Sequence, residues 1–240
     1  MSYSDFNYLF NINRNQVTSE RIIQLSPNFT LTLSLREKRI KDTRNNQEYD
    51  FDNEIASTLV FQDRMQGWFF KPALELLNNN YAMASVHLVT PLIEALEIYH
   101  KGEAGSSKSD FTNQAKQIFT SLSKNGAITF LYHGVRCGFA HKGFPQGASS
   151  AEQRNIVISL KQNNDPIVFE SNCLTIYARP YVESIQKAFE EFYEKIKTDS
   201  EARDKFRNVW SLHWNMKKNS FGHISEDIPD DFKTNHDRYS

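Results

Sequence analysis

Residues 81–99, YAMASVHLVTPLIEALEIY, decide the fold class, because they are apolar on almost every side of a helix. Apolar side chains occupy both halves of the helical projection: Val86, Val89, Leu92, Ile93 and Leu96 on one, and Ala84, Leu88, Ala95 and Ile98 on the other. A helix with this composition is buried in the middle of a bundle. We therefore predict a helical protein with this segment at its centre.

A narrow polar strip remains on this helix. At about 100° per residue, His87, Thr90, Glu94 and Glu97 fall together on one side. A carboxylate on a buried helix requires a partner. The strip either reaches solvent between neighbouring helices or pairs with arginine side chains, and the sequence leaves both interpretations open.

Helical periodicity on both sides of this segment predicts a bundle of four to five helices. The other helical segments cover approximately residues 53–77, 110–122, 126–141 and 180–196. Ser109 or Asp110 is placed to cap the helix that follows it. The last segment carries a regular apolar stripe of Val182, Ile185, Phe189, Phe192 and Ile196.

Two regions have the patterns of β-strands. Residues 29–36 alternate between apolar and polar side chains, which predicts a half-buried strand near the N-terminus, whereas residues 41–50, KDTRNNQEYD, predict a solvated loop. The β-branched runs NIVISL, PIVFE and CLTIY predict a small hairpin or three-stranded meander at about residues 155–178. The predicted fold class is therefore mainly α, with this β insert and one N-terminal strand.

The length of the chain suits either one large domain or two small ones, and we expect one composite domain in three parts. We expect residues 1–52 to form an N-terminal arm, irregular over residues 1–28, and a strand that packs on the core. Residues 53–214 are expected to form the helical domain with its β insert. Residues 215–240 lack periodicity and predict a polar tail.

Composition limits the partners that the chain can recognise. Lys and Arg number 28 and Asp and Glu number 29, so the net charge of −1 provides no overall basic field, and any contact with RNA must be local. The chain shows no secretory signal and no membrane-spanning segment, and we expect a soluble, cytoplasmic protein. Cys137 and Cys173 are too few for a disulfide framework and predict free thiols.

Residues 130–143, FLYHGVRCGFAHKG, end the fourth predicted helix with an arginine and a histidine. Four residues separate Arg136 from His141, and Lys-Gly follows the histidine. An all-helical core that ends in this way resembles the HEPN superfamily, whose signature is Arg-x4-6-His near the end of a late helix. The resemblance covers roughly residues 64–143.

The resemblance implies a HEPN-like helical bundle that works as a homodimer, either as a metal-independent ribonuclease or as a nucleotide-binding module. It implies that His141 is the general acid/base and that Arg136 binds phosphate. These side chains suit the chemistry, since an imidazole transfers protons near neutral pH and a guanidinium stabilises charge on phosphoryl oxygens. We expect cleavage of single-stranded RNA without a metal or cofactor; the alternative is a non-catalytic module that binds a nucleotide or a partner protein.

Residues near the motif have expected supporting roles. Glu94, and also Glu97, should lie within hydrogen-bonding reach of Arg136 or His141, and His133 is a further candidate at the site. Gly134 and Gly138 are four residues apart on the motif helix, and they would let the backbone of a second copy approach closely. The alternative is that they only relieve packing inside one chain.

Two other interpretations use the same residues. In a purely structural one, His141 stabilises the helix end and Arg136 forms a surface ion pair. In the other, His133, Cys137 and His141, which recur every four residues, bind zinc. No second ligand cluster and no HExxH pattern accompanies these three residues, so we expect no metal site.

Overall fold

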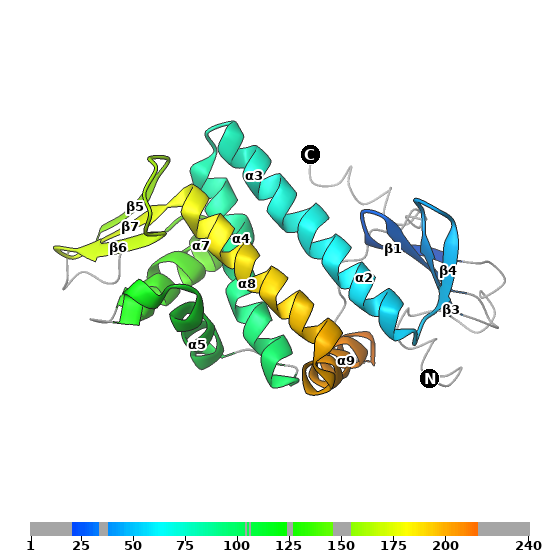
Figure 1. Cartoon of the computed structure of the whole chain (residues 1–240). Coiled ribbons are helices and arrows are strands. Elements are labelled where there is room, and N and C mark those ends of the chain that lie inside the picture. Colours follow the sequence, from blue (N-terminus) through cyan, green and yellow to red (C-terminus); the bar gives the residue numbers. More distant parts are fainter. Residues whose placement is uncertain are drawn as a thin grey trace, which may run out of the picture. The chain divides into compact units, whose positions relative to one another are not determined.

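The computed structural model of the chain describes residues 21–33, 38–103, 105, 107–123, 127–145 and 155–215. They belong to two compact units (Figure 1). Of the described residues, the first contains those up to Trp68 together with those after Ser211, and the second contains those from Phe69 to Ser211. Apart from Asn215, the predicted tail lies outside the described residues, as does the first part of the predicted N-terminal arm.

The first unit is built on a four-stranded antiparallel sheet. Its strands are β1 (Arg21–Ser26), β2 (Phe29–Leu33), β3 (Lys38–Asp42) and β4 (Gln47–Asp50), hydrogen-bonded in sequence order. Apolar side chains on one face are buried: Ile23, Leu25, Phe29, Leu31 and Ile40. In the register of the sheet, Ile23 pairs with Leu31 and Leu31 with Ile40, so these side chains form one layer.

Helix α2 (Glu54–Arg64) covers β1 of this sheet. It begins where the Asn53 side chain accepts a hydrogen bond from the backbone of Ala56. Its C-terminal end is tied to the turn between β1 and β2, because Asp63 accepts two hydrogen bonds from Asn28 and Arg64 donates one to the carbonyl of Leu25. The helix therefore has a fixed position over the sheet.

The prediction of a mainly α fold is wrong, because this sheet and a second one make the protein mixed α/β. The predicted irregular arm contains β1, and the predicted loop 41–50 contains the end of β3, a turn and β4. Asn46 supports the turn with a positive φ of 60°. Most of β4 is exposed, so its polar side chains show no alternation that a sequence pattern could detect.

The second unit is a helical bundle around α4. Its elements are α3 (Lys71–Asn78), α4 (Ala82–Lys101), α5 (Lys108–Ile118), η2 (Thr120–Ser123), α6 (Ala127–Phe130), η3 (Leu131–Arg136), α7 (Cys137–Lys142), α8 (Ala178–Thr198) and α9 (Ser200–Asn215), the last of which belongs to this unit up to Ser211. A π-helical turn, η1 (Met65–Phe70), joins α2 to α3. Of the helices in the described ranges, none is both long and apolar enough to cross a bilayer.

Helix α4 is central, as the sequence predicted. It packs against α3, α5, α8 and η3, and α8, yellow in Figure 1, runs beside it. The apolar stripe predicted for α8 is buried: Val182, Ile185, Phe189, Phe192 and Ile196. Where α8 begins, the buried hydroxyl of Tyr181 is 3.1 Å from that of Thr90 on α4. Thr90, one member of the polar strip, is therefore a core residue.

The cap of α5 differs from the predicted one. Ser107 is the N-cap, and its side chain accepts a hydrogen bond from the backbone of Asp110, whose carboxylate in turn accepts from the backbone of Ser107. This reciprocal capping box satisfies two backbone donors at once. Asp110 also bonds Lys101 at the end of α4, which holds the two helices together.

A three-stranded sheet follows the motif helix. Its strands are β5 (Asn155–Ser159), β6 (Ile167–Glu170) and β7 (Cys173–Tyr177). The hairpin of β6 and β7 was predicted, and Ser171 and Asn172 form its turn with positive φ angles. The alternative prediction of a three-stranded meander is wrong, because β5 pairs with β7 in parallel and the strand order is β5-β7-β6.

Candidate functional site

The motif lies on a helix with an irregular centre. α6, η3 and α7 follow one another without a break, and within η3 the backbone N–H of Cys137 bonds the carbonyl of Tyr132, five residues earlier. The helix ends after Lys142, where Gly143 has a left-handed φ of 73° and its N–H bonds the carbonyl of Phe139. Sequence periodicity predicted the helix but not the π turn, a feature that is frequent at functional sites.

Arg136, at the end of the π turn, is held by Glu94 of α4. Its Nε and Nη2 are 3.0 and 2.9 Å from the same carboxylate oxygen, Oε2. The side chain of Glu94 is 8% exposed and that of Arg136 is 28% exposed. The predicted contact between Glu94 and Arg136 is therefore confirmed, and one edge of the guanidinium is fixed while the group still reaches the surface.

The environment of Arg136 keeps it charged. Burial acts to lower the pKa of Arg136, but the negative charge of Glu94 and the hydrogen bond to it raise that pKa above its ordinary value. The guanidinium carbon is also 5.9 Å from the centre of the Tyr132 ring, one turn earlier on the helix. The Nη1 group, on the other edge, has no hydrogen-bond partner among the described residues.

Further polar groups surround the Tyr132 ring. The ammonium of Lys108, at the start of α5, is 5.9 Å from the ring centre, and the His133 ring lies edge-on to it at 5.0 Å. His133 is exposed as a residue, yet partial burial of its ring and then the charge of Lys108 lower its pKa. The surface beside Arg136 therefore has a second cation, Lys108, and an imidazole that is mainly neutral at pH 7.

His141 is exposed in the last turn of α7. Among the described residues, no hydrogen bond or ring contact joins it to Arg136. Because α7 is regular from Cys137 onward, five residues turn the helix by about 500°, and the two side chains leave the axis about 140° apart. The structure thus does not direct both side chains of one chain toward one point.

His87, a member of the polar strip, contacts the motif helix at a second point. Its ring is stacked on Phe139, with ring centres 4.4 Å apart and planes inclined by 6°. His87 is exposed, whereas Phe139 is buried. The sequence placed His87 and Glu94 on one side of α4 but gave no indication of this ring contact, which depends on how two helices pack.

Glu97 does not reach the motif. It lies near Lys101, Asp110 and Asn113, at the opposite end of α4 from His87, and burial is the largest influence that raises its pKa. No bond to Arg136 or His141 is formed by Glu97 within the described ranges. The expected role of Glu97 at the site is therefore not supported by its position, and only Glu94 contacts Arg136.

The structure also bears on the glycines of the motif helix and on the alternative zinc interpretation. Gly134 and Gly138 are buried within the chain, so they allow close packing inside the bundle and do not present a surface to a second copy. For the zinc interpretation, His133, Cys137 and His141 form no cluster: in the described part of the chain no three His, Cys, Asp or Glu side chains are grouped as metal ligands.

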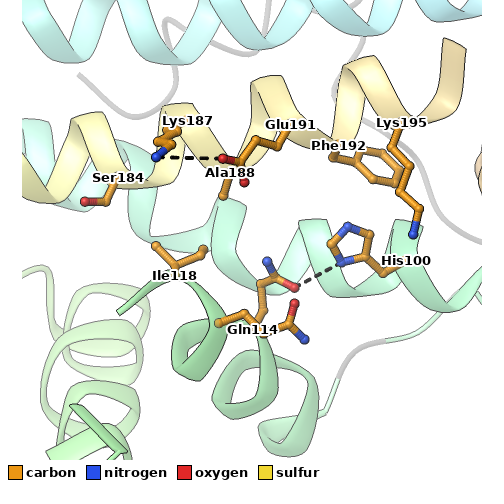
Figure 2. A pocket seen from close by; sticks show the side chains of 10 residues that line it. His100, Gln114, Ile118, Ser184, Lys187, Ala188, Glu191, Phe192 and Lys195 are labelled. Carbon is orange, nitrogen blue, oxygen red and sulfur yellow. Dashed lines mark hydrogen bonds and ion pairs between the residues drawn. The ribbon is translucent and has the colours of Figure 1, made fainter. Parts of the chain in front are cut away.

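A separate hollow of about 360 Å³ lies between α4, α5 and α8 (Figure 2). His100 and Gln114 meet in it, with the ring Nδ1 3.1 Å from the amide oxygen. Because an amide oxygen only accepts, Nδ1 carries the proton. Burial, opposed by this bond and assisted by Lys195 and Lys205, lowers the pKa of His100 and keeps the ring neutral at pH 7. No motif residue lines this hollow.

The chain was compared with protein-family models, with curated proteins and with solved structures, and none of them gives a significant match. The candidate site therefore rests on the geometry of Arg136, Glu94, Tyr132, His133 and the exposed His141.

Proposed function

We propose that the protein is a metal-independent endoribonuclease of HEPN type, which cleaves single-stranded RNA at a site formed by Arg136 and His141. The observation that carries the proposal is the partly exposed guanidinium of Arg136. Glu94 holds one edge of it, so the other edge can meet a phosphate in a fixed orientation. The resemblance of the motif to the HEPN signature is consistent with this use.

The chemistry assigned to His141 is proton transfer. The RNA 2′-hydroxyl gives its proton to the imidazole as its oxygen bonds to phosphorus, and the bond from phosphorus to the 5′ oxygen breaks. The imidazolium then returns the proton to the leaving 5′ oxygen. The products are a 2′,3′-cyclic phosphate and a 5′-hydroxyl, while Arg136 stabilises the charge on the phosphoryl oxygens.

A second copy of the chain completes the site in this proposal. Arg136 and His141 leave one helix about 140° apart, so a phosphate bound to Arg136 of one chain is best reached by His141 of another. Phe144, three residues after His141, is 51% exposed and offers apolar surface for contact between copies. A symmetric pair also doubles the local positive charge on a chain whose net charge is −1.

The non-catalytic alternative uses the same arginine. The free edge of Arg136 would bind the phosphate of a nucleotide equally well, and in that case His141 would have no chemical role. A DNA strand that carries a single ribonucleotide distinguishes the ribonuclease from the nucleotide-binding module. We expect cleavage after the ribonucleotide only, and none in the strand with a 2′-deoxy substitution there. Binding of both strands without cleavage would favour the nucleotide-binding module.

A further inference from the structure

We propose that His87, backed by Phe139, is the stacking platform for an unpaired base next to the phosphate that Arg136 binds. This inference rests on the proposed ribonuclease function and adds to it a site for the base. The parallel stack of His87 on Phe139, with ring centres 4.4 Å apart, covers one face of the imidazole and fixes its orientation. The ring is thus held flat at the surface by a buried phenylalanine.

The platform and the carboxylate that holds Arg136 both lie where α4 contacts the motif helix. Glu94 and His87 are seven residues apart on α4, and the residues that they contact, Arg136 and Phe139, are three apart on the motif helix. Seven residues correspond to about 10 Å along a helix axis. A strand whose phosphate contacts Arg136 therefore has a neighbouring base within reach of the His87 ring.

The chemistry of single-stranded RNA favours such a platform. Unpaired bases stack on aromatic and histidine rings, and this contact tolerates any base because each has a π-face. A chain of net charge −1 gains little from nonspecific attraction to phosphates, so a stacked base is an efficient source of affinity. A base already stacked and paired in a duplex is not available, which makes the inferred site selective for single strands.

A simpler role for His87 is to shield Phe139 from water. Three substitutions separate the two roles. His87→Phe keeps both the shield and the stacking surface, His87→Leu keeps only the shield, and His87→Ala removes both. If shielding is the whole function, the Leu variant matches the Phe variant in every measurement; if a base stacks there, the Leu variant matches the Ala variant in RNA binding.

The experiment measures binding of a fluorescent single-stranded RNA by anisotropy, with each substitution made in full-length protein that carries His141→Ala, so that the RNA stays intact. We expect His87→Ala and His87→Leu to bind about tenfold more weakly than the parent and His87→Phe to bind like it. A second set of RNAs has the base removed at one position in turn. At the position that meets His87, the abasic RNA should bind the parent and His87→Ala equally.

Three outcomes overturn the inference alone. They are unchanged binding by His87→Ala, a difference between parent and variant that persists at every abasic position, and full retention of binding by His87→Leu. If the parent protein binds no single-stranded RNA at all, the proposed ribonuclease function fails together with the inference. Binding that His87→Leu retains in full would assign His87 to shielding of Phe139.

Discussion

Arg136 and Glu94, which are 42 positions apart in the chain, meet between η3 and α4 with Nε and Nη2 of the guanidinium near one oxygen, Oε2. For Glu94, this contact decides between the two interpretations of the polar strip, because its carboxylate pairs with an arginine and does not simply reach solvent. The same contact is compatible with a purely structural ion pair. What points beyond structure is that Arg136 remains 28% exposed and keeps one edge turned away from Glu94.

Replacement of Glu94 by alanine should lower the free energy of unfolding by about 1–3 kcal/mol, since the partly buried guanidinium would lose the acceptor on its inner edge. Urea denaturation measures the change. Glu183→Gln is the matched control: Glu183 pairs with Arg179 at 3.8 Å on the surface of α8, and its loss should have almost no effect. Equal stability of Glu94→Ala and wild type would show that the pair contributes nothing to the fold.

The site formed by two copies can be tested by mixing two inactive proteins. Arg136→Ala and His141→Ala should each be inactive alone, but a dimer of one with the other has Arg136 and His141 intact at one of its two sites. Equal mixing should restore about a quarter of wild-type cleavage, because half of the dimers are mixed and each has one site. No recovery, in a sample whose mixed dimers are confirmed by native mass spectrometry, would place both residues of a site in one chain.

The partly buried imidazole of His100 should make stability depend on pH. Its pKa in the folded protein lies below the ordinary 6.5, first because of burial, so the folded state binds fewer protons than the unfolded chain. The contribution of neutral His100 to the free energy of unfolding is then fully present above about pH 6.5. It is lost as the pH drops below the pKa that this histidine has in the unfolded chain. Urea midpoints at about pH 7.5 and pH 5.5 should differ more in wild type than in His100→Leu.

His133→Leu is the control for this measurement. The pKa of His133 is shifted in the same direction, but the residue is exposed, so its removal should change the pH dependence less than removal of His100 does. A wild-type protein whose midpoint falls no further than that of His100→Leu would contradict the predicted effect of burial.

Chelation tests the zinc interpretation directly. We expect the melting temperature and the cleavage rate to be unchanged after dialysis against EDTA, because His133, Cys137 and His141 are not grouped as ligands in the described structure. Metal analysis of the purified protein is the measurement. Zinc at one equivalent per chain, together with a lower melting temperature after its removal, would contradict this prediction.

The helical part of the fold could be predicted because its signals are local. The apolar character of α4 and the stripe on α8 follow from side-chain periodicity, and burial of both is confirmed. The strands β3 and β4 could not be predicted in this way, since both are mostly polar: β3 has one apolar side chain, Ile40, and β4, at the edge of the sheet, is mostly exposed. The parallel pairing of β5 with β7 depends on the path of the chain between them and leaves no pattern in either strand.

For the site, spacing along one helix was sufficient for some contacts and insufficient for others. It placed His87 and Glu94 on one side of α4, and from this the contact of Glu94 with Arg136 could be predicted. The partner of His87 could not be predicted, because Phe139 contacts it only through the packing of α4 against the motif helix. The π turn could not be predicted either, because it alters the backbone without a change in residue pattern.

The most direct test of the proposed function is the incubation of pure protein with labelled single-stranded RNA in EDTA, with wild type compared with His141→Ala, Arg136→Ala and Arg136→Lys. Wild type should cleave, and each variant should be slower by about 100-fold or more with a melting temperature close to wild type. The Lys variant should fail because an ammonium cannot bond Glu94 on one edge and phosphate on the other. RNA left intact by wild type, or cleaved equally by His141→Ala, would contradict the proposal.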